Sequence, residues 1–238
     1  MHVTNESAGA IPGGMEDAPA MHTLRELWGS TVGRKALAAV SGLLLWIWVT
    51  LHVLGNLTLF SGPAAADGYA AVLHRAPGWL WAARAGLSAA ATVHVAAVAS
   101  LARAGRAARP RHEARAARRA STAAARSMRV GGALLLTFVG YHVAHLTLGL
   151  AHPGFRPGHV YDNVVGGLRT PWVAGVYAAA AALLGLHLFH GLWAAVRSLG
   201  ARPDAAAESR RPAVALLSAA VAAGFAAIPI AVLAGWLR

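Results

Sequence analysis

Apolar residues along this chain gather in five long runs, and most of the charged side chains lie in the connectors between them. The runs occupy residues 35–60, 79–101, 129–151, 172–197 and 212–237. A helix rises about 1.5 Å per residue, so each run is long enough to cross a hydrocarbon core of about 30 Å. The pattern predicts an all-α integral membrane protein with five transmembrane helices.

The segment before the first run divides into two parts. Residues 1–20 are acidic and rich in Gly, Pro and Ala, without the basic start or apolar core of a signal peptide, so we expect a disordered extension. Thr23 and Glu26 then fit a capping box at the start of an apolar helical face. This predicts a short interfacial helix at about 21–32, the beginning of a five-span domain that covers residues 21–238.

Basic residues predict how the chain is oriented in the membrane. The connector between the second and third runs carries nine arginines, from Arg103 to Arg129, against one acid, Glu113. The N-terminal flank and the connector before the fifth run are also basic, whereas the connectors at 61–78 and 152–171 carry few positive charges. We therefore expect a multi-pass protein of a bacterial cytoplasmic membrane, with its N-terminus inside and its C-terminus outside.

The composition agrees with this interpretation and limits the chemistry. Hydrophobic residues make up 57% of the chain and charged residues 13%, which is typical of a protein that lies in a bilayer. The net charge of +12 is explained by the basic connectors, so no nucleic-acid partner is expected. Cysteine is absent, which excludes disulfides, thiolate ligands and a covalently attached c-type haem.

Six of the twelve histidines fall inside the apolar runs, where imidazoles are costly and indicate a function. Counting residues along each span places His52 and His142 in the outer half of the membrane and His94 and His187 in the inner half. The histidines expected to be solvated lie in the termini and connectors, at positions 2, 22, 74, 112, 152 and 159.

Two histidine pairs at two depths on four helices are the arrangement that two bis-histidine b haems require in a four-helix bundle. The metal-binding prediction is therefore His52 with His142 for an outer haem and His94 with His187 for an inner haem. Each ligand is expected to donate its other ring N–H to the carbonyl one turn earlier, at Trp48, Ala90, Phe138 and Leu183. Small residues expected to make room for the macrocycles are Gly55, Ala90, Ala91, Gly140, Gly185 and Gly191.

Other polar residues leave alternatives open. His145 and His190 each follow a ligand by three residues, and either could bond a haem propionate or a quinone oxygen, or replace its neighbour as ligand. Arg84 could hold a propionate or extend toward the membrane surface. The fifth run has no histidine and contains Pro229, which predicts a peripheral helix that is kinked or straight. The spans contain no Asp or Glu, which argues against a proton pump or a cation-coupled transporter.

The motifs around the four ligands resemble one known family. They are L-H-V-L-G-N at His52, V-H-V-A at His94, Y-H-V-A-H at His142 and L-H-L-F-H-G-L-W at His187. With V-Y-D-N-V-V before the fourth span, they are similar to the dihaem cytochrome b subunit of menaquinone-linked succinate dehydrogenases and fumarate reductases. The resemblance covers nearly the whole chain after Met21, and it selects His142 over His145 and His187 over His190.

The resemblance implies a membrane anchor that transfers electrons through two b haems between an iron–sulfur subunit and menaquinone. A flavoprotein subunit and the iron–sulfur subunit would dock on the cytoplasmic face, and this chain would contain no catalytic residue for succinate. Some family members carry a glutamate in the fourth span, where this chain has Gly185 and Leu186, so a transmembrane proton path is not expected. Asp67 and Asp162, the outer acids, could exchange quinone protons or be solvated loop residues.

Two other functions remain open from the sequence. One is a haem b subunit of another quinone-linked dehydrogenase or of a hydrogenase, because such bundles also hold histidines at two depths. The other is a haem-free transporter or scaffold in which the histidines form hydrogen bonds between helices. Haem absorbance separates the second alternative from the first.

Overall fold

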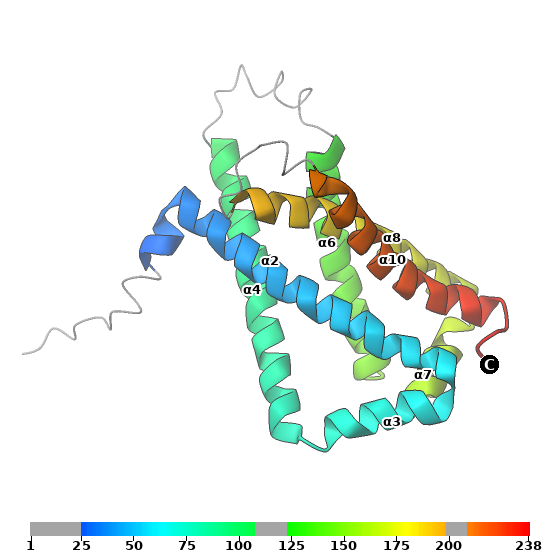
Figure 1. Ribbon diagram of the computed structural model, residues 1–238. Coiled ribbons are helices and arrows are strands. Elements are labelled where there is room, and N and C mark those ends of the chain that lie inside the picture. The colour runs from blue at the N-terminus through cyan, green and yellow to red at the C-terminus, as the bar shows by residue number, and fades with distance from the viewer. Residues whose placement is uncertain (1–24, 108–122, 199–208) are drawn as a thin grey trace, which may run out of the picture.

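The structure is a computed structural model that describes residues 25–107, 123–198 and 209–238 (Figure 1). Its elements in chain order are α2 (Thr31–Asn56), η1 (Leu57–Ser61), α3 (Pro63–His74), α4 (Pro77–Ala107), α6 (Ala123–His142), η2 (Val143–Thr147), α7 (Val160–Leu168), α8 (Pro171–Ser198) and α10 (Arg211–Leu233). The described residues contain helices and turns but no strand. The predicted extension at residues 1–20 lies outside the described residues.

Five helices in the described ranges are long and apolar enough to cross a membrane, which confirms the prediction of an all-α membrane protein. The third span ends at Thr147 rather than at residue 151. It closes with the single π turn η2, and Gly149 then turns the chain with φ of +70°. Gly149 also approaches Phe155 so closely that an added Cβ would lie 2.4 Å from the ring, a contact that only glycine avoids.

The predicted interfacial helix is shorter than expected within the described residues. Residues 25–29 are helical, and the next helix begins at Thr31 because the Ser30 side chain accepts a hydrogen bond from the Gly33 N–H at 2.8 Å. Gly33 lets the two helices meet at this corner, since a Cβ there would lie 2.1 Å from the Leu27 carbonyl oxygen. The prediction that one helix runs to residue 32 is therefore wrong.

Both expected outer connectors fold into helices that cover one end of the bundle, here called the cap end. The helices are α3 and α7, which pack against each other, and the Tyr161 N–H of α7 donates to Asp67 of α3 at 2.9 Å. Asp67 is therefore a structural link rather than a solvated loop acid. Asp162 is half exposed and pairs with Arg156, as a surface carboxylate does.

A hydrophobic core lies under this cap, at the junction of the two cap helices with the spans. Leu59 and Leu168 are 1% exposed and pack with residues from the start of α8 and the end of α10. Four exposed tryptophans mark the membrane interface around the same end, because indoles favour that region. They are Trp79, Trp81, Trp172 and Trp236.

The five long helices pack unevenly. Helix α2 packs along α4 and α8, and α10 and α6 pack against α8. In contrast, α4 and α6 make at most marginal contact and stand apart (Figure 1). Only 6–33% of the residues in each membrane-crossing window are buried. Protein side chains alone therefore leave much of the bundle's surface uncovered.

The fifth span is more closely integrated than a peripheral helix. Helix α10 continues through Pro229, which is buried, and it packs on both α8 and α2. Two glycines allow this contact: an added Cβ at Gly185 would lie 2.7 Å from the Ala222 Cβ, and one at Gly224 would lie 2.7 Å from Val53. Small residues let membrane helices approach closely.

Candidate functional site

Four helices each contribute one histidine, and the structure brings these histidines together in two pairs. The rings of His52 on α2 and His142 on α6 have centroids 5.8 Å apart and planes at 80°. Those of His94 on α4 and His187 on α8 have centroids 6.4 Å apart and planes at 74°. These are the pairs that counting residues along the spans predicts.

The spacing of both pairs fits an iron between the rings. A metal–imidazole bond of about 2 Å on each side, plus roughly 1.1 Å from each nitrogen to its ring centre, would place two ligating rings about 6.2 Å apart. Both observed separations are within about half an ångström of that value. Among the described residues, Nε2 of each of the four histidines makes no hydrogen bond, so this atom is available as a ligand.

The donor set favours a porphyrin over a bare metal ion. No group of three or more His, Cys, Asp or Glu residues that could hold a metal ion occurs in the part of the chain that the structure describes. A bare transition metal usually takes four or more protein ligands or waters. A porphyrin would itself supply four nitrogens to an iron, and the two imidazoles of each pair would then complete its ligands.

The pair of His94 and His187 is called the inner pair and that of His52 and His142 the outer pair, after their expected depths. The inner pair rests on small residues of neighbouring helices. His94 packs against Gly42 of α2, where an added Cβ would lie 3.1 Å from its Cε1. Its Nδ1 is 3.0 Å from the Ala38 carbonyl oxygen and 3.4 Å from the Ser41 hydroxyl. His187 packs on Gly132 of α6 in the same way, at 3.4 Å.

The predicted hydrogen bonds to carbonyls one turn earlier are wrong for all four ligands, since the His52 ring makes no bond to the Trp48 carbonyl within the described residues either. His94 uses Ala38 on another helix rather than Ala90, and Nδ1 of His142 and of His187 is buried without a partner. The carbonyl four residues earlier can accept such a bond, as at His74, whose Nδ1 lies 2.8 Å from the Ala70 carbonyl oxygen. A ring that extends sideways toward a partner on another helix turns away from that carbonyl.

Two of the small residues expected to make room for the macrocycles have other neighbours, since Gly55 accommodates Tyr69 and Gly185 accommodates α10. Gly140 has open space at its Cβ position, and for Ala90, Ala91 and Gly191 the expectation stays a prediction. Gly42 and Gly132 contact the ligands instead. Both lie on the helix that faces the histidine rather than on the helix that carries it, so a search of the sequence next to each histidine misses them.

A cluster of aromatic residues surrounds the outer pair. The ring of Tyr177 on α8 lies 5.8 Å from His142 and 5.0 Å from Phe138. Phe225 of α10 lies 5.7 Å from His52, so the fifth span contributes to this site although it has no histidine. Tyr177 and Phe225 were not among the predicted residues, because their spacing along the chain carries no signal of this contact.

His145 belongs to a different set of contacts from its neighbour His142. It is 2% exposed, its Nδ1 is 2.9 Å from the Tyr177 hydroxyl, and it stacks on Tyr141. The π turn directs it toward α7, where a Cβ at Gly167 would lie 2.8 Å from its ring. This arrangement leaves His142 as the residue that faces His52.

The prediction that His152 is solvated is wrong, because its side chain is half-buried. Its ring lies 4.9 Å from that of His145 and its Nδ1 is buried without a partner. Burial lowers the pKa of His152 below its ordinary value of about 6.5. The solvated positions predicted for His74 and His159 are confirmed, since both are exposed.

The remaining candidates lie away from the ring pairs. His190 packs on Phe189 with centroids 5.0 Å apart, next to the inner pair but not between its rings. The guanidinium of Arg84 lies 5.0 Å from the ring centre of Trp81, one of the interfacial tryptophans. That contact favours a position at the membrane surface for Arg84.

Comparisons of the chain with protein-family models, with curated proteins and with solved structures find no match in any of the three.

Proposed function

We propose that this protein is the membrane-anchor cytochrome b subunit of a succinate:quinone oxidoreductase, which transfers electrons between an iron–sulfur subunit and menaquinone. The observation that carries the proposal is the presence of two facing imidazole pairs, with centroids 5.8 and 6.4 Å apart, on four helices. The motif resemblance supports the choice of complex. The proposal assigns no catalytic residue for succinate to this chain.

Each part of the site has one task in this proposal. His52 and His142 would hold one b haem, and His94 and His187 would hold the other. The bound haem iron supplies one-electron chemistry by changing between the ferric and ferrous states. The Ala38 carbonyl fixes the ring plane of His94 and leaves Nε2 directed away from α2.

The positions of the two pairs along α2 support transfer across the membrane. His94 lies beside Ala38 and Gly42 of this helix, whereas His52 is ten residues beyond Gly42. At about 1.5 Å per residue the two sites are about 15 Å apart along the axis. Two redox groups at these levels would divide the crossing into short steps.

Haem content tests the proposal directly. The full chain, purified from haem-replete cells, should contain two b haems per polypeptide, measured from its reduced-minus-oxidised spectrum and as the pyridine complex. His94→Ala or His187→Ala should each lower the content to one, because each removes one ligand of the same site. His190→Ala is the matched control on α8 and should retain both. A wild-type chain without haem would refute the proposal and favour a haem-free scaffold.

The partner assignment needs a separate measurement. The tagged chain, isolated from its natural membrane, should bring down a flavoprotein and an iron–sulfur protein, and the complex should reduce a menaquinone analogue with succinate. If a dihaem chain copurifies with hydrogenase or formate dehydrogenase subunits, the proposed haem sites stand. The chain then belongs to that complex rather than to a succinate:quinone oxidoreductase.

A further inference from the structure

The two histidine pairs differ in what fixes the planes of their rings. In the inner pair, Nδ1 of His94 donates to the Ala38 carbonyl oxygen at 3.0 Å, and this bond orients the ring. In the outer pair, Nδ1 of His142 is buried and has no hydrogen-bond partner among the described residues. A metal-binding histidine usually takes its orientation from the hydrogen bond of its second ring nitrogen. The plane of His142 must therefore be fixed by packing.

Two aromatic rings pack against His142. The ring of Phe138, one turn earlier on α6, lies 5.9 Å from it with planes at 32°, and the ring of Tyr177 on α8 lies 5.8 Å from it with planes at 60°. Tyr177 also packs edge-to-face on Phe138, with centroids 5.0 Å apart and planes at 83°. Contacts between aromatic rings are directional. Because Tyr177 touches both rings from another helix, its position limits how far His142 can turn.

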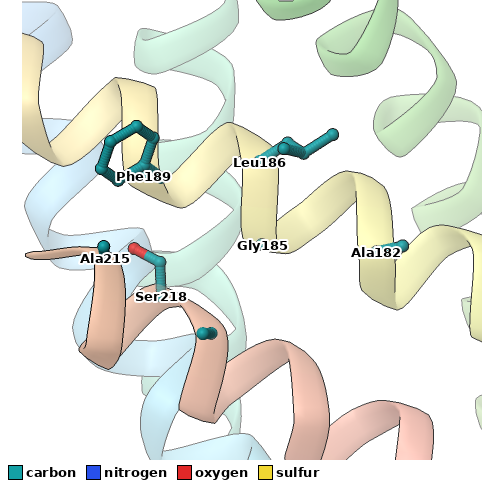
Figure 2. A pocket seen from close by; sticks show the side chains of 7 residues that line it. Ala182, Gly185, Leu186, Phe189, Ala215 and Ser218 are labelled. Atoms are coloured by element: carbon teal, nitrogen blue, oxygen red, sulfur yellow. The ribbon is translucent and has the colours of Figure 1, made fainter.

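Tyr177 is held at both ends of its side chain. Its helix α8 packs closely on α10, where Figure 2 shows Gly185 across from Ser218, and an added Cβ at Gly185 would lie 2.7 Å from the Ala222 Cβ. This packing fixes the backbone that carries Tyr177. At the other end, the Tyr177 hydroxyl lies 2.9 Å from Nδ1 of His145. Whichever of these two atoms donates, the hydrogen bond fixes the tilt of the phenol ring.

The position of His145 depends in turn on the cap helix α7. His145 is 2% exposed and stacks on Tyr141 with planes at 9°. Its other side lies against Gly167 of α7, where an added Cβ would be 2.8 Å from Cε1 and 2.9 Å from Nε2 of His145. Any larger residue at position 167 must therefore displace this ring. The adjacent Gly166 is different, because a Cβ there would meet only Nε2 of His152, at 4.0 Å.

We propose that Tyr177, held by His145, is the positioning residue of His142, and that α7 sets the position of His145 through Gly167. The contacts form one continuous series from the cap end to the outer pair. The inner pair shares none of these contacts within the described residues. The inference rests on the outer haem proposed above, because it concerns a ring that would bind its iron. It predicts that a small change in α7 alters the outer haem and leaves the inner haem as it was.

Electron paramagnetic resonance of the oxidised full-length chain tests the role of Tyr177. The low-spin signal depends on the angle between the two axial ring planes, which is 80° in the outer pair. The His94→Ala variant, which should keep only the outer haem, identifies the outer signal. Tyr177→Phe keeps the ring but removes the hydroxyl. We expect both haems to remain bound, the outer signal to broaden and become less anisotropic, and the inner signal to stay unchanged.

Two further variants separate the ring of Tyr177 from its hydroxyl. Tyr177→Leu removes both, and it should weaken outer-haem binding roughly 2- to 12-fold, the value of one aromatic pair contact. Tyr141→Phe is the matched control. It removes a hydroxyl from the ring that stacks on His145, and it should leave both signals as in the wild type. Wild-type signals from Tyr177→Phe, with two haems bound, would overturn the proposal and leave the haem sites standing.

Adjacent glycines of α7 test the contribution of the cap helix. Gly167→Ala should change the outer signal as Tyr177→Phe does, whereas Gly166→Ala, the same substitution one residue earlier, should not. If the effect passes through Tyr177, adding Gly167→Ala to Tyr177→Phe should change the outer signal little further. Equal changes from the two glycine variants, or an inner signal that changes as much as the outer one, would indicate general loosening and overturn the proposal. A wild-type chain without haem would overturn both this proposal and the function on which it rests.

Discussion

Alanine at position 42 should weaken the inner histidine site without unfolding the protein. The added Cβ would lie 3.1 Å from Cε1 and 3.3 Å from Nδ1 of His94, whereas ordinary contacts begin at 3.4 Å. The imidazole must therefore move by a few tenths of an ångström. Because its Nδ1 is held 3.0 Å from the Ala38 carbonyl oxygen, the movement strains or breaks that hydrogen bond.

Two opposing contributions determine the free-energy effect of Gly42→Ala. Strain from overpacking costs about 1–3 kcal/mol and a lost hydrogen bond about 1 kcal/mol, and both act at the site. Alanine gains up to about 1 kcal/mol over glycine within a helix, which acts on the fold. We therefore expect a small change in overall stability but a loss of about 2–4 kcal/mol in inner-haem binding, or roughly 30- to 900-fold in affinity.

Titration of haem into the purified apoprotein, followed by optical spectroscopy, measures this effect, with thermal unfolding in parallel. Gly132→Ala is the matched control, since its Cβ would lie 3.4 and 3.8 Å from His187 atoms, an ordinary contact. Gly86→Ala, with nothing within 4 Å, controls for helix propensity. The reasoning is refuted if Gly42→Ala binds two haems with wild-type affinity, or if Gly132→Ala loses the inner haem and Gly42→Ala does not.

Four further outcomes test other parts of the structure. The near-perpendicular imidazole planes of both pairs should give strongly anisotropic low-spin electron paramagnetic resonance signals, and parallel-plane signals would contradict the ring geometry. Asp67→Asn should speed hydrogen exchange in α7, because the charged carboxylate strengthens the bond from the Tyr161 N–H by about 1 kcal/mol or more. Asp162→Asn, at a half-exposed ion pair, should lower the opening free energy of α7 by under about 1 kcal/mol. Gly149→Ala should lower the unfolding temperature, since φ is +70° and Phe155 blocks the Cβ, whereas Gly140→Ala should not. The folded protein binds a proton at His152 more weakly than the unfolded chain does, because burial lowers its pKa. The cap end should therefore lose stability as the pH falls below about 6.5, and His152→Gln should remove that part of the pH dependence.

Much of the architecture is determined by the sequence because membrane insertion depends on local composition. Five apolar runs of about twenty residues or more suffice to predict five helices, since no backbone group can stay unpaired in hydrocarbon. Helical rise then converts residue number into depth, which places His52 with His142 and His94 with His187. The structure brings these rings together, and whether iron lies between them stays a prediction.

Tertiary structure decides what depth alone cannot, namely which face of one helix meets which face of another. Gly42 and Ala38 gain a role only because α4 packs His94 against them on α2. Tyr177 of α8 becomes part of the outer site because the packing of α6 against α8 brings its ring to His142 and Phe138. The predicted carbonyl partners failed for the same reason, since a bond within one helix competes with contacts from its neighbours. The sequence by itself determines how many helices cross the membrane and at which depth each histidine lies, because these depend on local hydropathy and helical rise. Helix rotation and approach, which set the surroundings of each ring, depend on side chains far apart in the chain, and so only the tertiary structure decides them.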